Sequence, residues 1–295
     1  MLTLEQLADL LLAHRESAKS RVAEFSLDGQ LFDFNSRRFL MGVINLSAES
    51  WYRESVCLSA DRAIERGTVL RAQGAHIIDV GAESTLANAK RIEDATQRSQ
   101  LLPVIKGLRE RKILVSVETY DAGITRACLE AGANTINLTG TANTEEIYRM
   151  AAAHGAAVII CYVQGANVRE VGEFKFSDDP IALMQEYFER EIERAQNVGV
   201  DKILIDPGLG FYYRNLQDSA VRIRHQMRIF LNTFRLRALG WPVCHALPHA
   251  FEYFGEEVRS AESFFAVLAA LGKTDLFRTH EVSKTRAVLD TLGVY

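Results

Sequence analysis

From about residue 39 onward, the sequence alternates between short apolar runs rich in β-branched residues and longer amphipathic segments. Short apolar runs bounded by turn residues predict buried strands, and apolar residues at helical spacing predict helices. The predicted strands are 39–45, 75–80, 113–118, 135–138, 156–162, 202–206, 242–246 and 275–278. The predicted helices are 58–73, 92–111, segments beginning at 122 and 144, 180–196, 216–239, a segment beginning near 260, and a last one after 278.

This repeated strand-then-helix order predicts an α/β fold with a parallel sheet. Eight such units over roughly 250 residues fit a closed (β/α)8 TIM barrel better than an open sheet. Glycines stand where helices end before buried strands, at Gly74, Gly132, Gly155 and Gly199. No Pro/Ser-rich linker interrupts the pattern, so we expect residues 39–295 to form one barrel domain.

Residues 1–38 lie outside the pattern and predict an N-terminal extension. Apolar spacing indicates a helix over about 3–22, and a β-hairpin is expected to turn at Asp28-Gly29. We interpret this helix and hairpin as a cap on the N-terminal mouth of the barrel.

Composition excludes several classes of protein. The chain of 295 residues is 48% hydrophobic and 24% charged, as expected for a globular protein, and its net charge of −4 provides no basic field for nucleic acid. The four cysteines are scattered without a CxxC pair, which is typical of reduced thiols. No apolar stretch is long enough to span a membrane, and Glu5 and Asp9 argue against a signal peptide. We therefore expect a cytoplasmic protein with no nucleic-acid or membrane partner.

Polar residues close or interrupt several predicted strands. In a barrel of this type the carboxyl ends of the strands meet at one mouth, where active sites lie. Carboxylates and a carboxamide can pair with the N–H groups of a flat heteroaromatic ring, whereas Arg and His suit an anion such as a diphosphate. An Asn near that anion could help to hold Mg²⁺, which prefers oxygen ligands. The residues concerned are Asn45, Asp79, Glu118, Asn137, Asp206, Arg278 and His280.

Six segments, in order along the chain, resemble motifs of the dihydropteroate synthase family. MGVINLSAES is similar to the family's MGxxNxTPDSF, AHIIDVGAEST to GAxIIDxGGEST, and VSVETY to xxSIDTY. TINLTG is similar to IINDVSG, IDPGLGF to DPGxGF, and FRTHEV to RVHDV. The resemblance covers nearly all of residues 39–285 and implies a pterin-binding TIM barrel.

The resemblance also implies roles for single residues. The implied pterin-binding residues are Asn137, Asp206 and Glu118. Glu118 occupies the position where the family has Asp. The catalytic, diphosphate-side residues are Asn45, Thr85, Arg278 and His280, with Asn45 also the metal ligand.

Two departures from the family pattern concern the second substrate. The family's Arg after EST is Leu86 here, and the segment CHALPHAF has no counterpart of the lysine in the family's Ser-Arg-Lys-Ser. His249 could replace that lysine, and Trp51, Phe251 and Tyr213 are candidates for contact with a different second substrate. Each aromatic side chain is also compatible with simple packing. His245, inside a strand, is interpreted as a core histidine.

The implied function is that of a transferase in folate biosynthesis. It would join 6-hydroxymethyl-7,8-dihydropterin diphosphate, or a related pterin, to an amine such as p-aminobenzoate or an altered second substrate, with Mg²⁺. A non-catalytic pterin-binding paralogue is the alternative, supported by the missing lysine. A methyl-pterin methyltransferase domain is disfavoured, because it has no use for a diphosphate-binding Arg-x-His. Five arginines on the helix 216–239 are most simply a solvated face, and a homodimer contact is the other interpretation.

Overall fold

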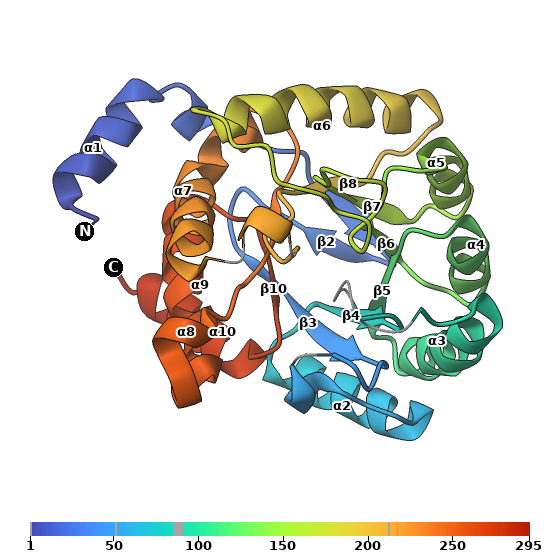
Figure 1. The fold of residues 1–295 in the computed structure, drawn as a ribbon. Helices are drawn as coiled ribbons and strands as arrows, with labels where there is room; N and C mark the ends of the chain where they lie inside the picture. Colours follow the sequence, from blue (N-terminus) through green and yellow to red (C-terminus); the bar gives the residue numbers. More distant parts are fainter. Residues whose placement is uncertain (1, 51, 85–90, 212, 217) are drawn as a thin grey trace.

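The computed structural model describes residues 2–50, 52–84, 91–211, 213–216 and 218–295. Its main sheet has eight parallel strands in the order β8-β7-β6-β5-β4-β3-β10-β9, ringed by helices (Figure 1). The strands are β3 (Phe39–Asn45), β4 (Ile77–Gly81), β5 (Leu114–Thr119), β6 (Thr135–Leu138), β7 (Ala157–Cys161), β8 (Ile203–Asp206), β9 (Cys244–Ala246) and β10 (Leu276–Thr279).

The two edge strands of this sheet, β8 and β9, approach each other and nearly close it into a barrel. Ile205 in β8 pairs in parallel with Val243, the residue before β9, and the Ile205 amide donates to the Pro242 carbonyl at 3.0 Å. This pairing confirms the predicted (β/α)8 barrel and places all eight strand ends around one mouth.

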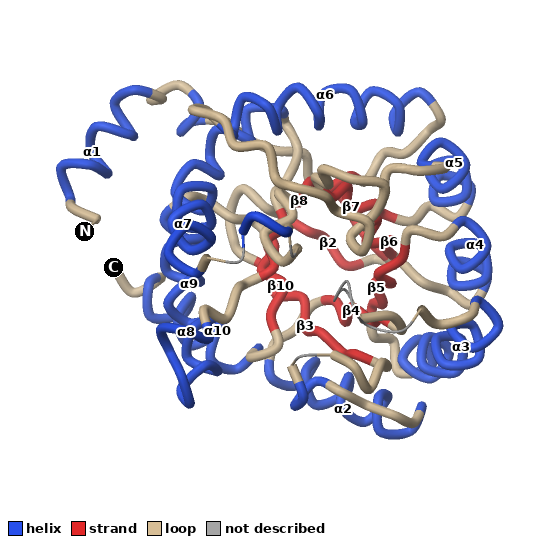
Figure 2. Tube along the Cα trace, viewed as in Figure 1, coloured by secondary structure: helices blue, strands red, loops and turns tan. Residues whose placement is uncertain are grey.

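Each barrel strand is followed by a helix that packs on the outside (Figure 2). These helices are α2 (Ala60–Gln73), α3 (Asp94–Glu110), α4 (Ala122–Glu130), α5 (Thr144–Ala153), α6 (Pro180–Asn197), α7 (Ser219–Leu236), α9 (Ala261–Leu271) and α10 (Val282–Leu292), and a short helix, α8 (Phe251–Phe254), precedes α9. Helices α2, α3 and α7 begin two or three residues later than predicted, and a side chain caps the start of α2 and of α7. Ser59 accepts the Arg62 amide before α2, and Asp218 accepts the Val221 amide before α7.

The N-terminal helix is shorter than predicted. Helix α1 spans Leu4–Ala13 and is followed by a 3-10 turn at Ser17–Lys19, so the prediction of one helix over 3–22 was wrong in its second half. A capping box between Thr3 and Gln6 fixes its start. None of its residues is buried, and only Leu7 and Leu10 pack against the core, so tertiary packing adds little stability to extend the helix further.

The predicted hairpin is present and packs at the N-terminal end of the barrel strands. Strands β1 (Phe25–Leu27) and β2 (Gln30–Phe32) turn at Asp28 and Gly29, both with positive φ. The ring of Phe32 lies 4.8 Å from that of Phe39, the first residue of β3. The hairpin is therefore at the end opposite the polar mouth, and the division into 1–38 and 39–295 stays a prediction. Among the described residues, no helix is both long and apolar enough to cross a membrane.

Candidate active site

One cavity of about 240 Å³ opens at the carboxyl ends of the barrel strands. Of the candidate residues that the structure describes, all but Asp79 and Tyr213 line it, whereas Trp51 and Thr85, like Leu86, lie outside the described residues. The lining includes Asn45, Glu118, Asn137, Asp206, His249, Phe251, Arg278 and His280. The barrel thus brings together side chains from five strand ends and from the loop after β9.

Arg278, on β10, joins two acids of neighbouring strands on the cavity floor. Its Nε donates to Asp79 Oδ2 at 2.7 Å, and its Nη2 donates to Glu118 Oε2 at 2.5 Å. Asp79 is fully buried on β4 and also accepts the side-chain amide of Asn137 at 3.1 Å. The sequence placed Asp79 among the polar strand residues but assigned it no role, and the structure makes it the common partner of Arg278 and Asn137.

Burial and the neighbouring charges strongly shift the pKa values of the groups in this network. Burial raises the pKa of Glu118 to about 7, against the attraction of Arg278, and the nearby Asp79 and Asp206 carboxylates add to the rise. Burial would lower the pKa of Arg278, but Glu118 and Asp79 outweigh this effect and raise it above its usual value. Glu118 can therefore exchange a proton near neutral pH, whereas Arg278 stays a cation.

Asp206 ends β8 and faces the same cavity. Its Oδ1 accepts the Gly208 amide at 2.7 Å, and burial raises its pKa to about 6 despite that bond. Gly208 has φ +73°, and a Cβ there would meet the Tyr162 carbonyl oxygen at 2.3 Å. Only glycine fits this turn, which explains why the segment Asp-Pro-Gly holds the carboxylate in place.

Hydrogen bonds fix the orientation of the Asn137 carboxamide. Its Nδ2 donates to Asp79, and its Oδ1 lies 3.4 Å from the Cys161 thiol, which donates to it. Burial raises the pKa of Cys161 well above its ordinary value, so the sulfur keeps the proton that it donates. No sequence motif indicates this role for Cys161.

The Asn45 side chain presents an oxygen to the cavity. Its Nδ2 donates to Ser55 Oγ at 2.6 Å, and Ser55 Oγ in turn donates to the Tyr52 carbonyl at 2.8 Å. Since the serine proton is used on Tyr52, Ser55 must accept from the amide nitrogen, which leaves Asn45 Oδ1 on the cavity side. An amide oxygen in this position suits Mg²⁺ shared with phosphate oxygens.

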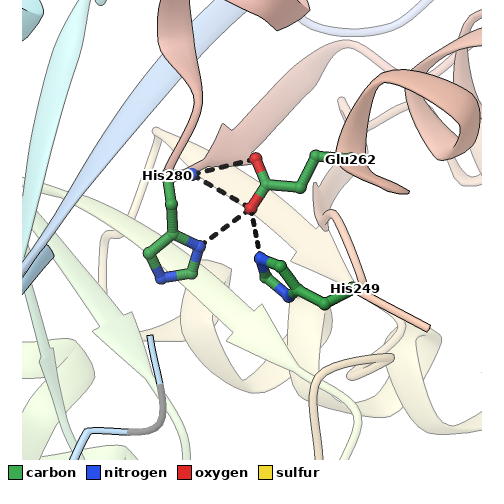
Figure 3. A group of neighbouring side chains, drawn as sticks. All are labelled: His249, Glu262 and His280. Atoms are coloured by element: carbon green, nitrogen blue, oxygen red, sulfur yellow. Dashed lines mark hydrogen bonds and ion pairs between the residues drawn. The ribbon is translucent and has the colours of Figure 1, made fainter. Parts of the chain in front are cut away.

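Two histidines and a glutamate form a second cluster at the mouth (Figure 3). His280, just after β10, and His249, after β9, point at the carboxylate of Glu262 on α9, with N···O distances of 2.9 and 2.8 Å. Interactions with both histidines hold the pKa of Glu262 far below its usual value despite burial, whereas burial lowers the pKa of His280. Sequence reasoning missed Glu262, although one acid near the start of the apolar segment 261–271 is a signal that could have found it.

The aromatic candidates divide into two groups. Phe251 lines the cavity and is 41% exposed, with its ring stacked on His249 at 5.9 Å between centroids. Tyr213 is buried and does not line the cavity, and its hydroxyl accepts the Gln164 amide at 3.0 Å, which favours the packing interpretation. Phe211 lines the cavity instead.

His245 is a core histidine, as predicted. It is fully buried, and its Nε2 lies 2.8 Å from Thr233 Oγ1 on α7. Burial lowers its pKa to about 3, so it stays neutral and contributes to packing between β9 and α7.

Comparison with known proteins gives a consistent result. The model of the family described as pterin binding enzyme matches residues 41–280. The dihydropteroate synthase of Synechocystis sp. is 32% identical over 217 residues, which are 72% of each chain. That of Mycobacterium leprae is 29% identical over 86% of this chain and 91% of its own.

Solved structures agree on the fold. A Yersinia pestis dihydropteroate synthase in a sulfonamide drug complex superposes with a TM-score of 0.78 at 22% identity, over 92% of this chain and 98% of that one. The dihydropteroate synthase of Thermus thermophilus has a TM-score of 0.73 at 25% identity, over 92% of this chain and 99% of its own.

Proposed function

The chain belongs to the family of pterin-binding enzymes and is a transferase of the dihydropteroate synthase type, and on this premise we propose how its own residues perform the reaction. The observation that carries the proposal is the convergence of Asp206, Asn137 and Glu118 on one cavity that also holds Arg278. Acids and a carboxamide on the floor and a cation beside them suit a ligand with a flat N–H-bearing ring and an anionic end.

We propose that the ring of 6-hydroxymethyl-7,8-dihydropterin diphosphate, or a related pterin, lies on this floor. Ionised Asp206 would accept two ring N–H groups, and Asn137 would pair with a neighbouring ring edge. Glu118, with its pKa near 7, would accept a further N–H or share a proton with the ring. The buried Asp79–Arg278 pair would hold these groups at fixed distances.

In the reaction, the amine nitrogen attacks the methylene carbon of the pterin, and the bond from that carbon to the diphosphate oxygen breaks. The bonding electron pair leaves with the diphosphate, and the attacking nitrogen releases a proton to solvent. We propose that Arg278 and His280, with Thr85, donate hydrogen bonds to the leaving oxygens, where negative charge develops. Arg278 therefore has two tasks, because it also pairs with the floor acids.

We propose Mg²⁺ as the cofactor, with Asn45 Oδ1 as its protein ligand. The orientation of the Asn45 amide supports this assignment, since its oxygen is on the cavity side. The ion would supply positive charge to the diphosphate and share its oxygen ligands.

The second substrate would enter over Phe251, Phe211 and His249, with Trp51 a further candidate. We propose p-aminobenzoate or another flat amine, because two aromatic rings and an imidazole at the mouth suit stacking. A homodimer and a cytoplasmic location stay predictions.

The decisive experiment is turnover of dihydropterin diphosphate, scored as diphosphate release with and without p-aminobenzoate. Release that depends on the amine would support the synthase. Tight pterin binding without release, whichever flat amine is supplied, would instead support a non-catalytic pterin-binding paralogue.

A further inference from the structure

We propose that His249, Glu262 and His280 form a binding site for a divalent transition-metal cation such as Zn²⁺, distinct from the Mg²⁺ site at Asn45. The three side chains come from the loop after β9, from α9 and from the end of β10. Two imidazoles and one carboxylate are a ligand set that proteins use for Zn²⁺ with one coordination position left open.

The distances are close to those that a metal ion needs. The three ligand atoms lie within 4.8 Å of one another, and both N···O separations to Glu262 Oε1 are below 3 Å, at 2.8 and 2.9 Å. Bonds of about 2.0–2.1 Å in a tetrahedral site place ligand atoms about 3.3 Å apart. The imidazoles would therefore move away from the carboxylate by about half an ångström, and the two histidine nitrogens, which lie within 4.8 Å of each other, would approach to about 3.3 Å.

Hydrogen bonds to its other oxygen already orient the Glu262 carboxylate. Glu262 is fully buried, and its Oε2 accepts the Glu281 amide at 3.1 Å and the Thr279 hydroxyl. These bonds leave Oε1 directed at the two histidines (Figure 3). Such outer bonds orient metal ligands in proteins and reduce the cost of ordering them when the metal binds.

The open coordination position would face the cavity. His249 and His280 line the cavity, whereas Glu262 does not. The ring of Tyr52 lies against both imidazoles, at 5.0 and 4.4 Å between centroids, and covers another side of the cluster. A water molecule or an anionic oxygen in the cavity would complete the coordination. The cavity also provides the route by which the ion enters.

Zn²⁺ binding can be measured with the metal alone, without any substrate. We expect the metal-free protein, titrated with Zn²⁺ in a buffer that does not chelate metals, to bind one ion per chain at this cluster. Co²⁺ in its place should give the strong visible absorption of a tetrahedral site, and excess Mg²⁺ should not compete, because it prefers oxygen ligands and octahedral geometry.

Two variants test the ligands. His249→Ala and Glu262→Gln should each weaken Zn²⁺ binding by about 100-fold or more, whereas His154→Ala, which removes an exposed imidazole at the end of α5, should not. His249 lies on a loop, so it tests the site even if the buried Glu262→Gln variant fails to fold.

The proposal is overturned if the wild type binds no stoichiometric Zn²⁺. It is also overturned if His249→Ala binds the ion as tightly as the wild type, in which case the cluster is only an imidazole–carboxylate hydrogen-bond array. Neither result depends on synthase activity, so the site and the proposed function fail or stand separately.

Discussion

Arg278 Nη2 lies 2.5 Å from Glu118 Oε2, so a cation on β10 is paired with an acid on β5, across the two strands that separate them in the sheet. The same guanidinium bonds Asp79 on β4 through Nε. One arginine thus fixes two acids on the floor of the cavity. Its role extends beyond the anion site that the family resemblance implies.

The first prediction follows from this double role. Arg278→Ala should weaken binding of a bare reduced pterin as well as of its diphosphate, because Asp79 and Glu118 lose the cation that holds them. A lost charged hydrogen bond costs about 1.5–3 kcal/mol, which corresponds to roughly a tenfold to hundredfold loss of affinity. Calorimetric titration with both ligands measures this. Arg278→Lys is the matched variant, since it keeps the charge but not the fork that reaches both acids. Unchanged affinity for the bare pterin would mean that Arg278 contributes only to binding of the diphosphate.

The second prediction concerns Asp206. Asp206→Asn should weaken pterin binding by roughly ten- to a hundredfold, because an amide replaces an ionised acceptor of two ring N–H groups. The control is Asp201→Asn, whose side chain is 77% exposed at the opposite end of the same strand region. If both variants bind a reduced pterin as the wild type does, Asp206 is not a ring ligand.

The third prediction concerns the pH dependence of stability. Because the pKa of Glu118 is raised to about 7 in the folded state, folding takes up a proton between the unfolded and folded pKa values. Its contribution to the free energy of unfolding is therefore favourable at low pH and is lost as the pH rises toward 7 and above. Glu118→Gln removes this loss, so it should raise the Tm relative to wild type at pH 8 more than at pH 5. Between pH 5 and pH 8, the difference in the free energy of unfolding between Glu118→Gln and the wild type should change by about 1–3 kcal/mol, at roughly 1.4 kcal/mol per pKa unit.

The exposed Glu130→Gln serves as the control for Glu118→Gln and should show no such difference between the two pH values. Equal Tm differences at pH 5 and pH 8 for Glu118→Gln would mean that Glu118 is ionised throughout this range.

The fourth prediction concerns the missing lysine. Turnover with p-aminobenzoate should be low, because a lost charge-assisted bond where charge develops costs about 10²–10³ in rate. Ala250 lines the cavity beside His249, and Ala250→Lys should raise the turnover at least about tenfold. Ala153→Lys, on the exposed end of α5, is the control for added charge. No gain at position 250, together with fast turnover by the wild type, would show that His249 already replaces the lysine.

Much of the barrel followed from the sequence, because its determinants are local. The strand 39–45 was predicted with the bounds that β3 has, since a continuous apolar run between turn residues admits few other structures. The turn after Asp206 is equally local, because only glycine tolerates the backbone of residue 208. Parallel order then places Asn45, Glu118, Asn137, Asp206 and Arg278 at one mouth without further information.

Tertiary structure decided which of these residues touch. No sequence pattern pairs Arg278 with Glu118 rather than with Asp206, because the choice depends on the reach of a guanidinium across the curvature of the barrel. The cluster of His249, Glu262 and His280 is a stronger case, since its members come from a loop, a helix and a strand end that meet only when α9 packs beside β10. The sequence by itself therefore determined the barrel, its polar mouth and the family. Packing between distant segments determined the charge pairs within the mouth, because side-chain contacts depend on distances that local periodicity does not encode.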